Sequence, residues 1–341
     1  MQPPGTCAST AAAQRRYARE PAAVTRQGGK SKARLVVYAA LGGNLAIAAT
    51  KLAAAAITGS SAMLSEGVHS LVDTANELLL LHGMSRAGKP ADRTHPFGYG
   101  RELYFWAFIV ALLVFALGAG VSIYEGVLHV RHPHPMERPL VNYIVLGASL
   151  VFEGVSWVIA LREFRSNKGE LGYFQAFRRS KDPTTFTVLF EDSAALIGLM
   201  IALVGIGAAQ WFAMPRLDGV ASIAIGVVLA VSSLLLARET KGLLIGESAN
   251  PRVRDDILQI AGEDPAIRSA NGVLTVHMGP DEVVAALSAE FHDALDTTQI
   301  EACINRIECA IKQRHPSVSI LFVKPQTREV WNKRTADARD A

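Results

Sequence analysis

The sequence predicts an all-α transmembrane domain of six helices followed by a cytoplasmic α+β domain. Half of the 341 residues are hydrophobic and 19% are charged, but the apolar residues are concentrated before residue 238. Several windows there exceed the roughly 18 apolar residues that a helix needs to cross a bilayer. After residue 238 the composition becomes mixed and polar, as it is in a soluble domain.

Six apolar segments qualify as membrane spans and define a transmembrane domain over residues 33–238. They are residues 35–57, 62–81, 103–128, 141–161, 185–212 and 217–236. Residues 1–32 precede them and contain no apolar stretch, so we expect a disordered cytoplasmic tail. A transit peptide is the alternative interpretation of this Arg-rich, acid-poor segment.

The distribution of Lys and Arg predicts the orientation. These residues gather in the N-terminal tail and in the loops after the second and fourth spans, whereas the opposite side has only Arg131, Arg138 and Arg216. Because Lys and Arg are enriched in cytoplasmic loops, both termini are predicted to be cytoplasmic. The compact loops favour an integral protein of the bacterial inner (plasma) membrane. The net charge of +3 is too small to indicate nucleic-acid binding.

Residues 239–327 show the element order αββαβ, typical of a small α+β sandwich with helices on one face of a sheet. A helix is expected over 251–264, strands over 266–280 and 281–295, an amphipathic helix over 297–316 and a last strand over 317–325. The second strand could also be helical by propensity. We expect residues 328–341 to form a flexible tail.

The second span is polar on one side. It carries Glu66, His69, Asp73, Asn76 and Glu77, which at about 100° per residue fall on one stripe of the helix. Each ionisable residue at the bilayer centre costs roughly 2.5–3.5 kcal/mol. Hydrogen bonds between helices could compensate, but three carboxylates with a His at i, i+4 from Asp73 favour an ion site. An imidazole with a carboxylate suits Zn²⁺, which takes four ligands.

The fifth span offers a second pair of ligands, Glu191 and Asp192, followed by small residues that permit close helix approach. The alternative is a pair of acids at a helix end, but their depth in the span is comparable to that of His69. Glu153 in the fourth span fits either a contact between helices or the lining of a pathway.

One loop on the non-cytoplasmic side, "HVRHPHPMERP", gathers His129, His132 and His134. Scattered loop histidines are the usual explanation, and a metal collector at the exit is the alternative.

Three segments resemble the cation diffusion facilitator family: "GSSAMLSEGVHSLVDTANELLLL", "DRTHPFGYGRE" and "LLIGESA". The resemblance covers residues 32–325. It implies a homodimer in which each protomer exports a divalent metal from the cytoplasm in exchange for protons. It also implies a cytoplasmic C-terminal domain of αββαβ, ferredoxin-like topology.

The resemblance places the family's transport site on His69 and Asp73 of the second span and on Asp192 of the fifth. The family has His or Asp four residues before that acid, where this sequence has Val188, so Glu191 is the expected substitute ligand. The variant "LFEDSAAL" looks like the branch that contains zinc transporter nine. Three carboxylates and one His form a harder ligand set than one that contains two His. The sequence therefore does not determine which divalent metal is preferred.

A second metal site in some members lies in the loop before the third span. Asp92 and His95 match it, but Tyr99 stands in place of the third ligand, so we expect this possible secondary metal site to be weak or absent. The strand near the C-terminus reads "LFVKP" and lacks the His and Asp that ligate zinc in other members. The sequence therefore predicts no binuclear zinc cluster in this domain.

These observations predict a Zn²⁺/H⁺ antiporter without a prosthetic group. The alternatives are the same transporter with Mn²⁺, Fe²⁺, Co²⁺ or Ni²⁺ as cargo, or a membrane metal sensor that does not transport. An enzyme is not expected, because the sequence has no H-E-x-x-H stretch and no Ser nucleophile motif.

Overall fold

The computed structural model describes residues 27–167 and 183–337, which divide into two compact units. One unit is a helical bundle formed by Thr25–Ala87 and Glu102–Gly242. The other combines Gly88–Arg101 with Leu243–Ala341. The segment between the second and third predicted spans therefore groups with the C-terminal domain. In contrast, the sequence assigned it to the transmembrane domain.

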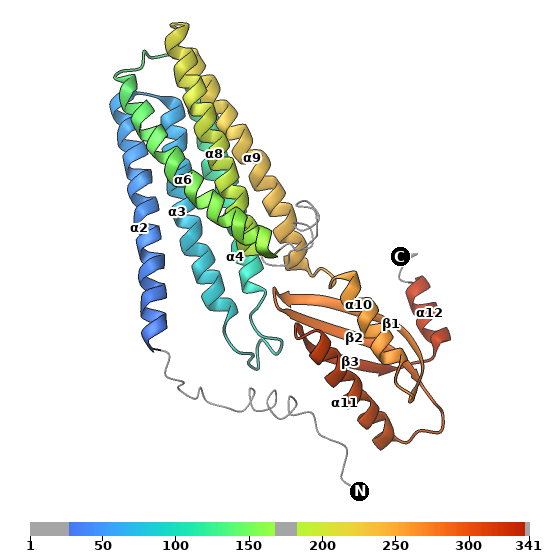
Figure 1. Cartoon of the computed structure of the whole chain (residues 1–341). Coiled ribbons are helices and arrows are strands. Elements are labelled where there is room, and N and C mark those ends of the chain that lie inside the picture. The colour runs from blue at the N-terminus through green and yellow to red at the C-terminus, as the bar shows by residue number, and fades with distance from the viewer. Residues whose placement is uncertain (1–26, 168–182, 338–341) are drawn as a thin grey trace. The chain divides into compact units, whose positions relative to one another are not determined.

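The bundle consists of long helices, seen in Figure 1 as extended rods that run side by side. Their bounds are α2 Gln27–Thr58, α3 Ser61–Ala87, α4 Glu102–Leu113, α5 Gly120–Arg131, α6 Pro139–Asn167, α8 Pro183–Trp211 and α9 Arg216–Ile245. Helix α2 begins within the range that the sequence assigned to the N-terminal tail. The rest of that predicted tail, residues 1–26, lies outside the described residues.

Five helical segments among the described residues are long and apolar enough to cross a membrane. They are Leu41–Thr58, Glu102–Arg131, Pro139–Arg162, Thr187–Trp211 and Arg216–Ile245. Helix α3 has the length of a span but does not qualify by composition, because it carries the polar stripe. Five of the six predicted spans thus correspond to candidate membrane helices, and the second does not reach this criterion.

A short π-helix, η1 (Val114–Ala119), joins α4 to α5 without a break in the span. Val114 at its start and Ala119 at its end are both buried. A π turn holds one more residue than an α turn, so these two positions share a face although they are five residues apart.

Small residues allow a close approach of α5 and α9 in the bundle. A Cβ on Gly126 of α5 would lie 2.7 Å from the carbonyl oxygen of Gly219 on α9 and 2.8 Å from the amide nitrogen of Ile223. Only hydrogen fits at this crossing. The bundle core around it is apolar and includes Met63, Leu146, Leu199, Ile206, Ile225 and Leu229.

The turn between α2 and α3 uses the backbone freedom of one glycine. Gly59 has φ of +68°, a left-handed conformation that suits glycine at the end of a helix. Its amide donates to the carbonyl of Ala55 at 2.8 Å. Asp218 of α9 then accepts a hydrogen bond from the amide of Ser61, where α3 starts. The carboxylate at this N-terminus opposes the positive end of the helix dipole.

The C-terminal unit has the order that the sequence predicted: α10 Pro251–Gly262, β1 Ile267–Gly279, β2 Glu282–Phe291, α11 Thr297–Arg314 and β3 Val318–Pro325. The sheet order is β1-β2-β3, with β1 antiparallel and β3 parallel to β2. The second strand is a strand and not the helix that propensity left open. Its odd-numbered residues from Val283 to Phe291 are all buried, which fits a strand with one covered face, and Ser288 is the one buried residue on the other face.

Helices α10 and α11 provide the apolar side of this unit. Ile257 of α10 and Cys303, Ile307 and Ile311 of α11 are all at least 98% buried. Helix α11 starts with a capping box in which Asp296 and Gln299 each accept a hydrogen bond from the other's backbone amide.

Within the predicted flexible tail, Arg328–Asp337 form helix α12, and residues 338–341 lie outside the described residues. The ring of Trp331 lies directly over Gly272 of β1, where any Cβ would overlap it. The amide of Arg328 also donates to Glu290 Oε2 at 3.0 Å. These contacts are not encoded in helical periodicity, which is weak in this segment.

Candidate metal site

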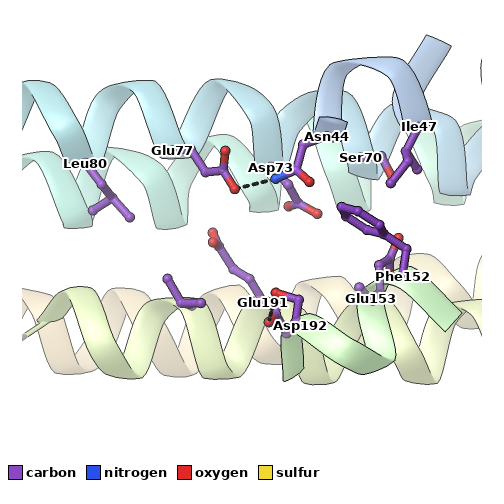
Figure 2. Close-up of a pocket in the computed structure, with 13 residues that line it drawn as sticks. Asn44, Ile47, Ser70, Asp73, Glu77, Leu80, Phe152, Glu153, Glu191 and Asp192 are labelled. Atoms are coloured by element: carbon purple, nitrogen blue, oxygen red, sulfur yellow. Dashed lines mark hydrogen bonds between the residues drawn. The ribbon is translucent and has the colours of Figure 1, made fainter. Parts of the chain in front are cut away.

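A cavity of about 90 Å³ lies between α3 and α8, flanked by α2 and α6. Figure 2 shows Asp73 and Glu77 reaching into it from α3, with Glu191 and Asp192 opposite them on α8. Its volume suits an ion with a few water molecules. The lining residues are Asn44, Ile47, Ser70, Asp73, Glu77, Leu80, Phe152, Glu153, Ser156, Val188, Glu191, Asp192 and Ala195.

Helix α3 contributes His69 and Asp73, which lie one turn apart on the same face. His69 Nδ1 is 3.4 Å from Asp73 Oδ1, and the His69 side chain is 1% exposed. Both ring nitrogens of His69 and Asp73 Oδ1 are buried, and within residues 27–167 and 183–337 none has a hydrogen-bond partner. Buried polar atoms are nearly always paired, so these three neighbouring exceptions mark His69 and Asp73 as candidate ligands.

Helix α8 contributes Glu191 and Asp192, and polar neighbours hold each of them. Asn76 of α3 donates from Nδ2 to Glu191 Oε1 at 2.8 Å. Ser156 of α6 donates from its hydroxyl to Asp192 Oδ2 at 3.2 Å. Each carboxylate keeps a second oxygen that can accept a proton or a metal ion.

The predicted ligands come together as pairs and not yet as one coordination shell. Among the described residues, no three side chains of His, Cys, Asp or Glu are arranged to hold a metal ion. Asp73, Glu191 and Asp192 line the cavity, whereas the buried His69 does not. Coordination of one ion by all four requires side-chain rotation or closer approach of α3 and α8.

Two further carboxylates line the cavity beyond the four predicted ligands. Glu77 accepts a hydrogen bond from Asn44 Nδ2 of α2, as the dashed line in Figure 2 marks. Glu153 of α6 lines the cavity as well and also contacts Lys51 of α2, so it has both of the roles that its sequence context allowed. An acid in the middle of an apolar span is the signal that identifies Glu153.

Lys51 joins Glu153 to the polar stripe of α3. Its ammonium donates to Glu153 Oε1 at 2.7 Å, to Ser70 Oγ at 2.9 Å and to Glu66 Oε2 at 3.3 Å. Lys51 and Glu66 are fully buried. This cluster links α2, α3 and α6 and places one positive charge between two acids, of which Glu153 lines the cavity.

The predicted secondary site has a different arrangement. Asp92 Oδ1 accepts from the Thr94 hydroxyl and from the amides of Thr94 and His95, and its Oδ2 accepts from the Tyr99 hydroxyl at 2.7 Å. These donors, Tyr99 first, hold the pKa of Asp92 well below its ordinary range. The His95 ring packs against Tyr99, with ring centroids 4.2 Å apart. In this arrangement Asp92 organises the loop, and Tyr99 occupies the place of a third ligand.

The chain matches the family described as the cation efflux transmembrane domain over residues 37–245. It is 35% identical over 267 residues to the proton-coupled zinc antiporter SLC30A9, mitochondrial, of Xenopus laevis, covering 75% of this chain and 47% of the relative. The human protein of that name is 33% identical, over 69% of this chain and 42% of its own length.

A bacterial relative matches over nearly its whole length. The cation-efflux pump FieF of Cronobacter sakazakii is 27% identical over 85% of this chain and 92% of the relative. The present chain thus spans about half the length of the mitochondrial antiporters and almost all of the bacterial pump. The family match covers more than half of the chain and includes every predicted ligand of the cavity. The chain therefore belongs to the cation efflux family, the cation diffusion facilitators.

Proposed function

We propose that this chain exports a divalent metal ion, Zn²⁺ in the first instance, from the cytoplasm in exchange for protons. The transport ligands in this proposal are His69 and Asp73 of α3 with Glu191 and Asp192 of α8. The observation that carries it is the set of buried, unpaired polar atoms on His69 and Asp73 beside a cavity whose far wall is Glu191 and Asp192.

A metal ion supplies what these atoms lack. Unpaired buried polar atoms are costly, and coordination of a doubly charged ion would satisfy the imidazole and neutralise the carboxylates together. The names of the relatives agree with this cargo, since two of them are proton-coupled zinc antiporters and another is a cation-efflux pump.

Proton coupling follows from the ligand chemistry. A metal binds the deprotonated imidazole and carboxylates, so protons and metal compete for the same lone pairs. Metal that enters from the cytoplasm displaces protons, and protons that arrive from the opposite side release the metal. Alternating access then requires α3 and α8 to open toward one side at a time around the site, with each ligand favouring a different state.

The membrane arrangement in this proposal has six spans, with α3 as the second. The exposed apolar residues of α3 include Leu71 and Leu78, whereas Glu66, His69 and Asn76 are buried. An apolar outside with a polar inside fits a helix that faces lipid on one side and the bundle on the other. Both termini are placed in the cytoplasm, the assembly is a homodimer, and the membrane is the bacterial inner membrane.

The ligand set also favours a second group of cargoes. One imidazole among several carboxylates is harder than a site with two His, and oxygen ligands suit Mn²⁺. Glu77 and Glu153 add oxygen ligands at the same cavity. Mn²⁺, Fe²⁺, Co²⁺ and Ni²⁺ are therefore the alternative cargoes of the same mechanism, and a metal sensor without transport is the remaining alternative.

The experiment is metal-driven proton flux in proteoliposomes with a pH-sensitive dye inside. We expect Zn²⁺ to drive proton movement with the wild-type chain, and His69→Ala and Asp73→Ala to abolish it while the purified protein keeps its elution volume. Glu125→Gln, a span carboxylate that does not line the cavity, is the matched control and retains flux. Wild-type flux in Asp73→Ala would remove this mechanism. A series of other divalent ions at equal concentration identifies the preferred cargo.

A further inference from the structure

A second cavity, of about 250 Å³, lies in the bundle unit at the end where α3 begins and α8 finishes. It shares no residue with the cavity between Asp73 and Asp192. Three side chains that can ligate a metal line it, and they come from three different segments. The lining residues are His129, His134, Pro135, Met136, Ala209, Gln210, Ala213, Pro215 and Asp218.

Two of the three side chains are buried and face each other. His129 in the last turn of α5 is 9% exposed, and Asp218 in the first turn of α9 is 1% exposed. His129 Nε2 and Asp218 Oδ2 are 3.8 Å apart, which is too far for a hydrogen bond. Two ligands of a tetrahedral Zn²⁺ at bond lengths near 2.1 Å lie about 3.4 Å from each other. The observed separation is close to that of two ligands that share one ion.

The third side chain is next to this pair. The His134 ring centroid lies 6.0 Å from that of His129, and the two rings are nearly perpendicular. His134 belongs to the loop that follows α5, so its position can adjust more easily than that of His129. As at the first cavity, no three ligands among the described residues form a closed shell. A shift of the His134 side chain toward Asp218 would complete a site with two imidazoles and one carboxylate.

Asp218 has a structural role that explains its burial but not the position of His129. Its oxygens accept from the Ser60 hydroxyl at 2.8 Å and from the Ser61 amide at 2.5 Å, which anchors the start of α3. Together with a hydrogen bond from the Ala62 amide, those contacts use three of the roughly four acceptor positions of the carboxylate and leave one available. The imidazole of His129 lies beside this carboxylate without a hydrogen bond between them, and α5 could have placed an apolar side chain there.

We infer that this cavity is a second divalent-metal site, with His129, His134 and Asp218 as its ligands. Two imidazoles and a carboxylate suit Zn²⁺ and the neighbouring borderline metals more than Mg²⁺ or Ca²⁺. The two helices that bear the transport ligands also flank this cavity, α3 through the Asp218 contacts and α8 through Ala209 and Gln210. A role of this site in metal release rests on the proposed function. The binding of metal at this site does not require transport.

The test is Zn²⁺ titration of the full, tag-free chain in detergent by calorimetry, in a His69→Gln, Asp73→Asn background that disables the first site. We expect a remaining equivalent of Zn²⁺ per protomer. His129→Gln and His134→Gln should each weaken its binding at least tenfold. His132→Gln is the matched control, because His132 is an exposed residue of the same loop that does not line the cavity. The His132→Gln variant should bind Zn²⁺ with unchanged affinity. Asp218 is left intact because it anchors α3.

Two further results decide the matter. Co²⁺ bound in the same background should give the intense visible absorption of a tetrahedral site, and His129→Gln should remove it. Unchanged Zn²⁺ affinity in both His129→Gln and His134→Gln, or equal loss in His132→Gln, would overturn the assignment. Should Zn²⁺ drive no proton flux in the wild type while this equivalent persists, the proposed function fails and this inference survives.

Discussion

The Lys51 ammonium lies 2.7 Å from a carboxylate oxygen of Glu153, 102 residues further along the chain. No part of the Lys51 side chain is exposed. The same ammonium is 3.3 Å from Glu66. Removal of one partner from a buried ion pair destabilises the fold strongly, because the other charge stays buried without compensation. Replacement of both partners by apolar residues costs much less.

We therefore expect Lys51→Met to destabilise the bundle by about 3 kcal/mol or more. Thermal unfolding in detergent, followed by loss of the monodisperse elution peak, measures the effect. Lys89→Met, at an exposed position, should unfold as the wild type does. Adding Glu66→Gln to Lys51→Met should recover part of the stability, and an unaffected Lys51→Met would show that the cluster does not hold the helices.

Val188 stands where the family usually has a His or Asp ligand, and this difference gives a second prediction. Val188 and Glu191 both line the cavity, one turn of α8 apart. We expect Glu191→Gln to weaken Zn²⁺ binding by roughly tenfold or more, as is typical when a site loses a supporting group. Adding Val188→His should restore Zn²⁺ affinity and shift selectivity away from Mn²⁺, because imidazole is the softer ligand.

Calorimetric titration with Zn²⁺ and Mn²⁺ compares the single and double variants. Val188→Leu in the Glu191→Gln background is the control for side-chain size, and it should restore nothing. Full Zn²⁺ affinity in Glu191→Gln alone would show that Glu191 is not a ligand.

The contact between Gly126 and Gly219 gives a third prediction. A Cβ at Gly126 would come within 2.8 Å of two backbone atoms of α9, so α5 and α9 must separate to admit it. Overpacking of this kind costs about 1–3 kcal/mol. We expect Gly126→Ala to lower the unfolding temperature in detergent. Gly147→Ala on α6 has no atom within 4 Å of the new methyl group and should be neutral. Equal unfolding temperatures for the two variants would contradict this packing.

The acid sensitivity of the C-terminal unit gives a fourth prediction. His315 Nε2 lies 2.7 Å from Asp256 Oδ2, and chiefly this contact lowers the pKa of Asp256 from its ordinary value of 3.8. A carboxyl whose folded pKa is depressed stabilises the fold above the unfolded pKa, and this contribution disappears as the pH falls through the folded pKa. Asp256→Asn should therefore be less stable than the wild type at neutral pH and equally stable in strong acid.

Thermal unfolding of the full chain across a pH series from about 2 to 7 measures the difference between wild type and variant. It should be present at about pH 5 and shrink toward zero as the pH falls below the ordinary Asp value. Asp255→Asn is the matched control, since the neighbouring Asp255 side chain is exposed. A difference that grows toward acid pH would contradict the sign of this effect.

The sequence predicted the helices and the C-terminal topology because both follow from local patterns. Apolar runs identify α2, α6, α8 and α9, and alternation with turn residues identifies the strands. Helix α3 is too polar to qualify as a span because of its stripe from Glu66 to Glu77. The same stripe predicted the ion site. The position of that stripe on one helical face was computable from spacing alone.

Contacts between residues of different helices could not be predicted from such local patterns. The ion pair of Lys51 with Glu153 and the approach of His129 to Asp218 join residues about 90 to 100 positions apart, and periodicity carries no information on partners at that separation. Helix α12 was missed because its stability comes from Trp331 on Gly272, a tertiary contact. Whether the four predicted ligands bind one ion stays a prediction.

The widened turn of η1 sets how far α5 is rotated about the helix axis relative to α4. Both helices contact α3, and α5 also reaches α9 through Gly126. If Val114–Ala119 were α-helical, everything after it would rotate by about 100° about the helix axis. Gly126 would then leave α9, and His129 would turn away from Asp218. The extra residue in the turn of η1 thus decides which way His129 points in the last turn of α5.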